Sequence, residues 1–454
     1  MIIGATLVSA QATPPASAAA KQNIAYADAK PILETLREDL LPVEFQAKTP
    51  RDIAAAWQQW VSRRDLDIRA RLERGDQDSI VNFLLFGVTF TTQPRIKAHD
   101  ILVLAGQGRT DDILQGPVVQ RRIDDLIAGA ASPGANERLQ FVRRAIQAGG
   151  ADPVTPAGRS QASRYLDSGL RRVLAEYQAY AQAPASEQSV RFGDRGLSSD
   201  TSVSSGFAID QALEAIVAER LIGAGRVRRV AIVGPGLDFT DKREGYDFYP
   251  QQTLQPFAVI DSLIRLGVAA GNDLQITTFD LSDRVNQHLD AARRRARSGD
   301  AYVLQLPRDK DSAWTPSLVS YWERFADRIG EPVAPIAPPL DLGDVEVRAV
   351  RVADATVLTI TPRDLNIVLQ RQPPLPGNGF DLIVATNLLV YYDVFERSLA
   401  LANVATMLRP GGLFLANNSA PVVLPPSMDA VGDSETIFSS QPNDRDRIVW
   451  YRKK

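Results

Sequence analysis

The stretch Val230-Ala-Ile-Val-Gly-Pro-Gly-Leu-Asp238 decides the expected fold of the chain. Its first four residues are apolar, which is typical of a strand that is covered on both faces of a sheet. Gly234 and Gly236 come directly after them, and glycine lets the backbone turn sharply and pass close to a bound group. Such turns also occur where no ligand binds. The interpretation of this turn therefore depends on the strands and helices that come after it in the chain.

The composition is that of an ordinary globular protein. The chain has 454 residues, of which 44% are hydrophobic and 23% are charged, and its net charge is −3. This length corresponds to about two or three domains. Because positive charge is not in excess, nucleic acid is not expected as a partner. After the N-terminal residues, no stretch reaches the ~20 apolar residues of a membrane span, so none is expected.

The scarcity of cysteine and histidine excludes several kinds of chemistry. The chain has no cysteine and two histidines. Thiolate nucleophiles, disulfides, cysteine-based zinc sites and multi-histidine metal sites are therefore excluded. No metal is expected.

Residues 1–20 have the features of a secretory signal. An apolar run leads to Ala10-Gln-Ala12, which has the small-x-small pattern of a cleavage site. No lysine or arginine precedes Lys21, however, so a disordered alanine-rich leader is the alternative. The first interpretation predicts an exported protein, periplasmic or secreted, and the second a cytoplasmic one.

The N-terminal part of the chain reads as helical. Apolar residues recur at three- and four-residue spacing, as at Trp57, Trp60 and Val61, which predicts an all-α domain over residues 21–182 with these aromatic rings in its core. Residues 183–206 are small and polar and predict a flexible linker, with a lid over a ligand site as the alternative. Residues 207–454 then form a second domain.

The glycine turn belongs to a strand-turn-helix-strand unit. An aromatic insertion at 239–249 is followed by a helix from about residue 256 to 264 and by a strand at 274–279 that ends in Asp280. A carboxylate at this place in such a unit accepts hydrogen bonds from the hydroxyls of a ribose. Asp280 has a second interpretation, as a cap of the helix expected at 282–298.

Two more strand ends are expected further along. After an irregular stretch and a helix at 316–329, strands are predicted at 345–352 and 356–360, and Arg363-Asp-Leu-Asn366 closes the second of them. Phe380–Asp393 reads as another strand with its exit loop. A helix begins at Val394, with Asp393 and Glu396 as a capping pair, and Arg409-Pro-Gly-Gly412 turns the chain into one more strand.

Residues 207–454 resemble the class I S-adenosylmethionine-dependent methyltransferases. FDLIVATNLLVYYD and MLRPGGLFLANN are similar to the fourth strand, the helix after it and the fifth strand of that family. The loop TNLLVYYD is similar to the corresponding loop of the chemotaxis-receptor carboxyl methyltransferases. The resemblance implies an α/β, Rossmann-like fold with a seven-stranded, mostly parallel sheet. Its antiparallel last strand would come from the segments 435–439 and 447–451.

The resemblance also implies a cofactor, S-adenosylmethionine, and the residues that hold it. The cofactor-binding positions carried over are Gly234 and Gly236 for its methionine part, Asp280 for its ribose, Asp364 or Leu365 for its adenine, and Asn387 and Leu388 for the methyl-transfer face. The chain departs from the family at Ile232, where an acid is frequent, and at Asp238, which replaces a third glycine.

Methyl transfer from a sulfonium is an in-line displacement, so a protein promotes it mainly by positioning the reactants. No catalytic base is identified by the sequence. Tyr391, Tyr392 and Asp393 are the nearest candidates, with packing and capping as their alternative roles. The expected function is methyl transfer to an unidentified O or N acceptor on a small molecule or a protein. The alternative is an exported, non-catalytic binding or scaffold protein; a nucleotide-linked oxidoreductase is disfavoured by the Arg-Pro-Gly-Gly turn.

Overall fold

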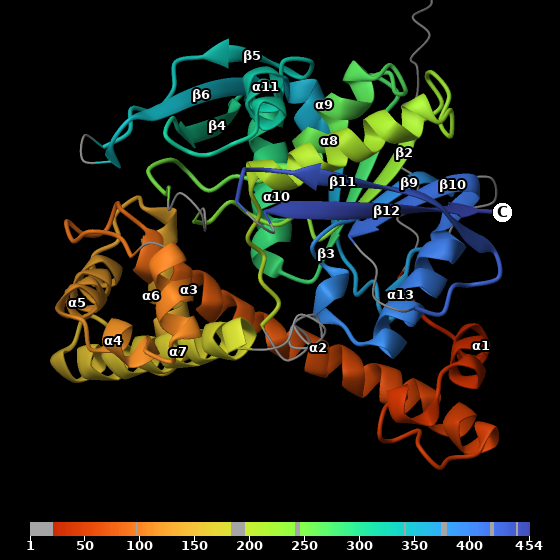
Figure 1. The fold of residues 1–454 in the computed structure, drawn as a ribbon, viewed down its shortest axis with the longest axis horizontal. Helices are drawn as coiled ribbons and strands as arrows, with labels where there is room; N and C mark the ends of the chain where they lie inside the picture. Colours follow the sequence, from red (N-terminus) through yellow and green to blue (C-terminus); the bar gives the residue numbers. More distant parts are fainter. Residues whose placement is uncertain are drawn as a thin grey trace, which may run out of the picture.

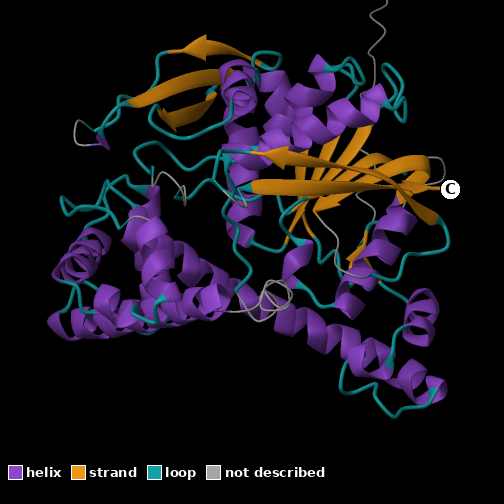
Figure 2. Ribbon diagram, viewed as in Figure 1, coloured by secondary structure: helices purple, strands orange, loops and turns teal. Residues whose placement is uncertain are grey.

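The computed structural model describes residues 21–96, 98–182, 196–240, 246–339, 342–373, 379–417, 422–441 and 444–454. Figures 1 and 2 show a large sheet with helices on both faces, a small sheet above it and a group of helices below and to the left. Residues 1–20, to which the predicted signal or leader belongs, lie outside the described residues.

The large sheet has seven strands, as expected. Their order across the sheet is β11 (Met428–Ile437), β12 (Arg445–Lys453), β10 (Leu408–Asn417), β9 (Phe380–Ala385), β2 (Arg229–Val233), β3 (Gln275–Asp280) and β7 (Ile360–Asp364). The pairs from β10 to β7 are parallel, and β12 runs antiparallel to both of its neighbours. The predicted mostly parallel sheet with an antiparallel strand from the C-terminal pair is thus confirmed.

β2 is buried on both faces, as its apolar run predicts. Val230 and Ile232 belong to a core on one side of the sheet, whereas Ala231 and Val233 belong to a core on the other side. This alternation results from the two-residue period of a strand. Two apolar layers must therefore cover the sheet, and they come from different parts of the chain.

Helices that come after residue 200 build the first of these layers. It contains α8 (Val203–Ala218), α9 (Gln255–Arg265) and α10 (Asp283–Ser298). The second layer contains α13 (Val394–Met407), α1 (Tyr26–Thr35) and the first half of α2 (Pro50–Phe86), which carries Trp57 and Trp60. Both tryptophans are buried there, which confirms that they pack in a core, but this core is shared with the sheet and is not that of a separate all-α domain. The 3-10 helices η1 (Glu38–Leu40) and η4 (Leu389–Tyr391) lie in the same part of the structure.

The N-terminal region is not purely helical. A short strand, β1 (Gln22–Asn23), pairs antiparallel with β8 (Gln370–Arg371), and Ile24 donates its N–H to the carbonyl of Leu369 at 2.8 Å. Two residues are too short a run for periodicity to show a strand. Through this strand pair, the start of the N-terminal region is hydrogen-bonded to the C-terminal part of the chain, which contains the large sheet.

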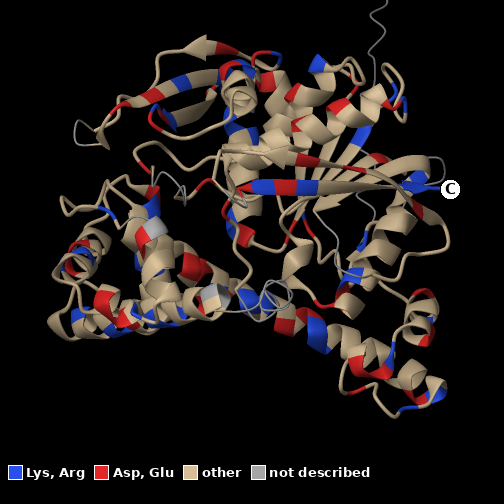
Figure 3. Cartoon of the chain, in the orientation of Figure 1, with Lys and Arg blue, Asp and Glu red and all other residues tan. Residues whose placement is uncertain are grey.

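The second half of α2 enters a separate helical group. It packs with α3 (Ala98–Gly106), α4 (Thr110–Leu114), α5 (Pro117–Ala131), α6 (Glu137–Ala148) and α7 (Pro156–Gln182) around a third apolar core. Figure 1 shows α2 as one long helix that runs under the large sheet and joins this group to α1. In Figure 3, acidic and basic residues interleave along this helix and its neighbours.

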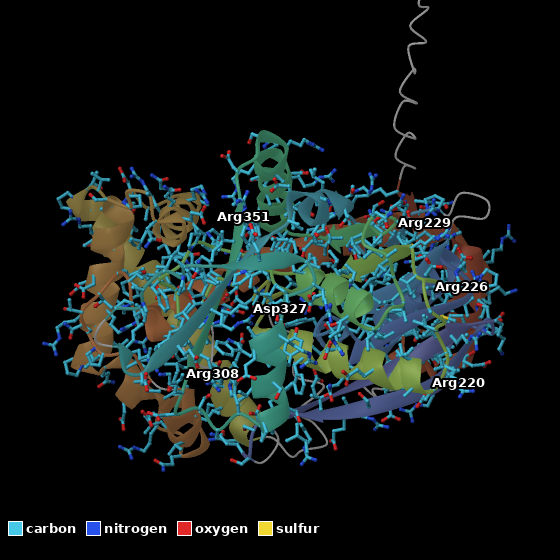
Figure 4. All side chains as sticks on the ribbon, turned by 90° about the horizontal axis from the view of Figure 1, so that it is seen from above. Arg220, Arg226, Arg229, Arg308, Asp327 and Arg351 are labelled. Atoms are coloured by element: carbon cyan, nitrogen blue, oxygen red, sulfur yellow. The ribbon has the colours of Figure 1, made fainter. Side chains whose placement is uncertain are left out.

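The second, smaller sheet was only partly expected. It has the order β4 (Tyr302–Asp309), β6 (Val345–Val352), β5 (Gly330–Val333), with antiparallel pairs, and Figure 4 labels Arg308 on β4 and Arg351 on β6. The segment of β4 reads as irregular in the sequence because Pro307 interrupts its alternating pattern. α11 (Pro316–Arg324) lies between β4 and β5 in the chain.

The predicted strand at 356–360 is wrong. These residues belong to α12 (Asp354–Thr359), and β7 begins at Ile360. The β-branched residues of this stretch favour a strand locally, but Asp354 in the first turn of the helix favours the helix. None of the described helices combines the length and the apolar character that crossing a membrane requires.

One buried arginine joins the helical group to the insertion after the glycine turn. Arg138 of α6 donates hydrogen bonds to the backbone carbonyls of Phe239, Tyr249 and Asp238, the last at 3.3 Å. The ring of Phe239 lies between Phe83 and Phe141 of the same group, with centroid distances of 5.7 and 5.2 Å. The aromatic insertion is therefore a structural connection between the two parts of the molecule.

We expect Arg138→Met to lower the free energy of unfolding by about 3 kcal/mol, because three buried carbonyl groups lose their donors. Chemical denaturation followed by circular dichroism measures this change. Arg109→Met is the control, since Arg109 makes an exposed ion pair with Asp112 and is expected to change stability by less than about 0.5 kcal/mol. Equal effects of the two substitutions would contradict the structural role of Arg138.

Candidate functional site

A cavity lies at the carboxyl ends of the central strands. It is lined by residues at the ends of β2, β3, β7 and β9 and in the loops after them, by Leu72 of α2, by residues 197–201, and by Ser205 of α8 and Gln255 of α9. Its volume is about 720 Å³ when the open solvent at its mouth is included. The chain continues from β2 to β3 on one side, whereas β9 lies on the other side of β2, so the strand order reverses here. In open α/β sheets, ligands bind in the crevice at such a reversal.

The glycine turn forms one wall of the cavity. Gly234 and Gly236 have φ angles of +66° and +65°, which residues with a side chain rarely adopt. A Cβ atom on Gly236 would lie 2.5 Å from the carbonyl oxygen of Ser199, and one on Gly234 would lie 3.3 Å from Leu388. Both positions therefore require glycine for conformation and for space.

Residues 197–201 lie against this turn. Leu237 donates its N–H to the carbonyl of Ser199 at 2.7 Å, and Thr201 donates its N–H to the carbonyl of Leu237 at 3.0 Å. Leu197 donates to the carbonyl of Arg71 in α2 at 3.1 Å. This part of the predicted linker is therefore a wall of the cavity; residues 183–195 lie outside the described residues, and a lid stays a prediction.

Asp280 is the last residue of β3 and lines the cavity. Its Oδ1 accepts a hydrogen bond from the N–H of Ser282 at 2.8 Å, and the backbone of Gly236 also bonds to this carboxyl group. Burial is the main cause that raises the pKa of Asp280 to about 7. The carboxyl group thus faces both the start of α10 and the cavity, but the N-cap of α10 is Ser282, so the interpretation of Asp280 as the cap is not confirmed.

The pKa of Asp280 predicts a pH dependence. A ligand whose hydroxyl groups donate hydrogen bonds to Asp280 binds best when the carboxyl group is ionised. Since the pKa is raised to about 7, this group gains a proton as the pH falls through 7, and the affinity should fall in the same range. We expect S-adenosylhomocysteine to bind more tightly at pH 8 than at pH 6, as titration calorimetry at both values would show. The Asp280→Asn variant should lose this difference; an unchanged pH dependence in that variant would exclude Asp280 as its origin.

The end of β7 provides an apolar wall. Leu365 and Ile367 line the cavity, together with Leu281 from the end of β3. Asp364 does not belong to the lining, because its carboxylate accepts from Lys21 Nζ at 2.7 Å and from Arg69 Nη1 at 2.8 Å. Of the two residues proposed from the sequence to flank adenine, the structure brings Leu365 to the cavity and holds Asp364 in ion pairs beside it.

The exit loop of β9 forms the mouth of the cavity. Asn387 and Leu388 line it, and Asn387 has a φ angle of +58°. Asn387 Nδ2 donates to Ser205 Oγ at 3.2 Å, and Thr386 Oγ1 accepts from Gln255 Nε2 at 2.6 Å. Neutral amide and hydroxyl groups thus hold this loop in place, with Asn387 exposed and with Thr386 and Gln255 buried beneath it.

The acid-base groups near the cavity are few. Of the three candidates for a base, only Tyr392 is among the described lining residues, and burial raises its pKa far above neutral values. Asp393 caps α13 in the predicted pair with Glu396, which is confirmed. His288 lies elsewhere, half-buried, with Nε2 2.9 Å from Tyr302 Oη, and loss of solvent around the ring lowers its pKa to about 4. Asp280 is therefore the described lining residue with a pKa near neutral, and it is the residue expected from the sequence to bind a ribose.

The described lining of the cavity is acidic, and it is fully charged only above about pH 7, where Asp280 is ionised. Its described lining contains two carboxylates, Asp200 and Asp280, and no lysine, arginine or histidine. Asp200, which sequence reasoning did not single out, accepts a hydrogen bond from Ser79 of α2 at 3.0 Å. Among the described residues, no group of acidic or histidine side chains could hold a metal ion. The site thus favours a ligand with net positive charge.

Comparison with known proteins gives only distant matches. No protein-family model and no curated protein matches the chain. Among solved structures, it is similar to the N-methyltransferase NodS from Bradyrhizobium japonicum WM9 in complex with S-adenosyl-L-homocysteine, with 14% identity over 54% of this chain and 84% of NodS and a TM-score of 0.25. The magnesium protoporphyrin IX methyltransferase ChlM from Synechocystis PCC 6803 with bound SAM shares 10% identity over 62% of this chain and 91% of its own, with a TM-score of 0.25. TrmN from Thermus thermophilus shares 13% identity over 74% of this chain and 79% of its own, with a TM-score of 0.27. Similarity at this level does not identify a ligand of this chain.

Proposed function

We propose that the chain is an S-adenosylmethionine-dependent methyltransferase that acts on an O or N acceptor of a small molecule or a protein. The observation that carries this proposal is the meeting of three predicted elements in one cavity. The glycine turn after β2, Asp280 at the end of β3 and Leu365 after β7 come from separate strands and line the same space at the reversal of strand order.

The residues present fit this cofactor chemically. S-adenosylmethionine has a positive sulfonium, a positive ammonium and one carboxylate, so its net charge matches a cavity whose described lining has two carboxylates and no cation. Asp280 can accept hydrogen bonds from a ribose diol, and the apolar side chains of Leu365 and Ile367 can pack against the adenine. Gly234 and Gly236 line the cavity, so their backbone can pass close to the methionine part.

The chain's part in the reaction is positioning. When bound, the cofactor supplies an electrophilic methyl group that needs no acid or base to become reactive. Leu72 and residues 197–201 line the cavity on the side of α2. Asn387 and Leu388 at the mouth would orient the acceptor toward the methyl group at a separation of about 3–3.5 Å. This division of roles agrees with the scarcity of titratable groups at the site.

We further infer that the helical region around α2 takes part in selecting the acceptor, because Leu72 of that helix lines the cavity. Export of the protein stays a prediction from residues 1–20. No described feature favours the non-catalytic scaffold over the enzyme.

The test is transfer of label from S-adenosylmethionine carrying a tritiated methyl group to pools of small molecules and peptides. We expect acceptor-dependent label transfer by the wild-type chain and none by Gly236→Val, whose added side chain would collide with the backbone of Ser199. If the wild-type chain neither transfers label nor binds the cofactor or its demethylated product, the proposed function is wrong.

A further inference from the structure

Asn387 has a backbone conformation that needs support. It is one of the few described residues other than glycine with a positive φ angle, +58°, and it stands at the mouth of the cavity. Such a conformation costs about 1 kcal/mol for a residue with a side chain, although asparagine tolerates it better than most. Its persistence at this place indicates that neighbouring groups hold it there.

A chain of two side chains provides this support. The N–H of Asn387 donates a hydrogen bond to Oδ1 of Asn417, the last residue of β10. Nδ2 of Asn417 donates in turn to Oδ2 of Asp446 on β12, and Oδ1 of Asp446 accepts from the N–H of Arg447 at 2.8 Å. Asp446 thus fixes the amide of Asn417, which fixes the backbone of Asn387. β10 and β12 are paired strands, so the support is rigid.

The side chain of Asn387 has one acceptor left for a ligand. Its Nδ2 donates to Ser205 Oγ, which fixes the plane of the amide. None of the described groups donates a hydrogen bond to its Oδ1. Asn387 is exposed and lines the cavity, so this carbonyl oxygen is available to a molecule that enters the mouth.

We propose that Oδ1 of Asn387 accepts a hydrogen bond from the N–H or O–H group that receives the methyl group, and that Asn417 and Asp446 are positioning residues for it. This inference rests on the proposed function and narrows the acceptor to one that carries a hydrogen on its nucleophilic atom, an amine or a hydroxyl rather than an ionised carboxylate. In the transfer, the bond from sulfur to the methyl carbon breaks, and sulfur keeps its electron pair. The acceptor's lone pair forms the new bond to carbon, and the acceptor's proton leaves to water at the open mouth.

The test compares two ligands that differ at the methyl position. S-adenosylhomocysteine has no group at this position, whereas sinefungin carries a protonated amine there. The N–H groups of this amine take the place of the N–H or O–H group of the methyl acceptor. Titration calorimetry gives both affinities for the wild-type chain and for Asn387→Gly, Asn417→Ala and Asp433→Asn. Glycine suits the positive φ at position 387, and Asp433 is an exposed residue of β11 that pairs with Arg447.

We expect the preference for sinefungin over S-adenosylhomocysteine to fall about tenfold in Asn387→Gly and at least threefold in Asn417→Ala, as the loss of one charge-assisted hydrogen bond predicts. The affinity for S-adenosylhomocysteine itself should stay within about threefold, and Asp433→Asn should resemble the wild type. Thermal unfolding of each variant shows that it is folded.

Three other results would overturn the inference. If the wild-type chain binds both ligands and Asn387→Gly keeps the full preference, the role of Asn387 is wrong while the proposed function stands. If Asn387→Gly loses the preference for sinefungin but Asn417→Ala keeps it in full, the positioning role of Asn417 and Asp446 is wrong. If the wild-type chain binds neither ligand, the proposed function fails, and this inference with it.

Discussion

Replacing Asp280 by alanine is expected to weaken the binding of S-adenosylhomocysteine about 100-fold. The substitution removes the carboxylate that would accept two hydrogen bonds from the ribose, and hydrogen bonds to a charged group contribute about 1.5–3 kcal/mol each. A loss of about 2.7 kcal/mol corresponds to a factor of 100 in the dissociation constant. The measurement is titration calorimetry at pH 8, where Asp280 is ionised because its pKa is raised only to about 7.

Asp273→Ala is the matched control for this prediction. Asp273 is an exposed acid that precedes the opposite end of the same strand, β3, and it does not line the cavity. Its replacement should leave the affinity within about twofold, because a surface substitution away from the site changes little. Equal affinities of Asp280→Ala and the wild type would show that the ligand does not meet the end of β3.

Gly75→Ala is expected to lower the free energy of unfolding by about 3 kcal/mol, although alanine in place of glycine usually stabilises the interior of a helix. Gly75 lies in α2 where residues 196 and 197 cross it, and a Cβ atom there would lie 1.9 Å from the carbonyl oxygen of Leu197. That backbone must move away from the helix. Because Leu197 lines the cavity, we also expect the affinity for S-adenosylhomocysteine to fall about tenfold.

Denaturant unfolding and calorimetry check this prediction against Gly106→Ala. Gly106 also belongs to a helix, α3, but a Cβ atom there would meet nothing within 4 Å. Its replacement should be neutral or stabilise the chain by up to about 1 kcal/mol. The crossing of α2 by residues 196 and 197 is contradicted if both substitutions stabilise the chain to the same extent.

The parts of the site that the sequence predicts are those encoded locally. The apolar run of β2 and the glycines after it lie within one stretch, and Asp280 and Leu365 stand at strand ends that a parallel sheet brings to one edge. The capping pair of Asp393 and Glu396 is also a short-range pattern. For these residues, chain order and strand direction are sufficient.

The residues that sequence reasoning missed reach the cavity through distant packing. Leu72 lines it because α2 runs beneath the sheet, and no local pattern shows where a helix will dock. Ser198 to Thr201 read as a solvated linker because they are small and polar, yet they pair with the glycine turn. The ion pair of Asp364 with Lys21 joins positions 343 residues apart, so no spacing rule could find it.

The most direct test of the central claim is titration of S-adenosylhomocysteine into the full wild-type chain, combined with thermal unfolding in its presence. The cavity at the ends of β2, β3 and β7 predicts one binding site per chain with a dissociation constant in the micromolar range, and at 100 times that concentration a stabilisation of about 2.7 kcal/mol. The absence of both binding heat and a shift in the unfolding temperature would contradict the assignment of this cavity to the cofactor.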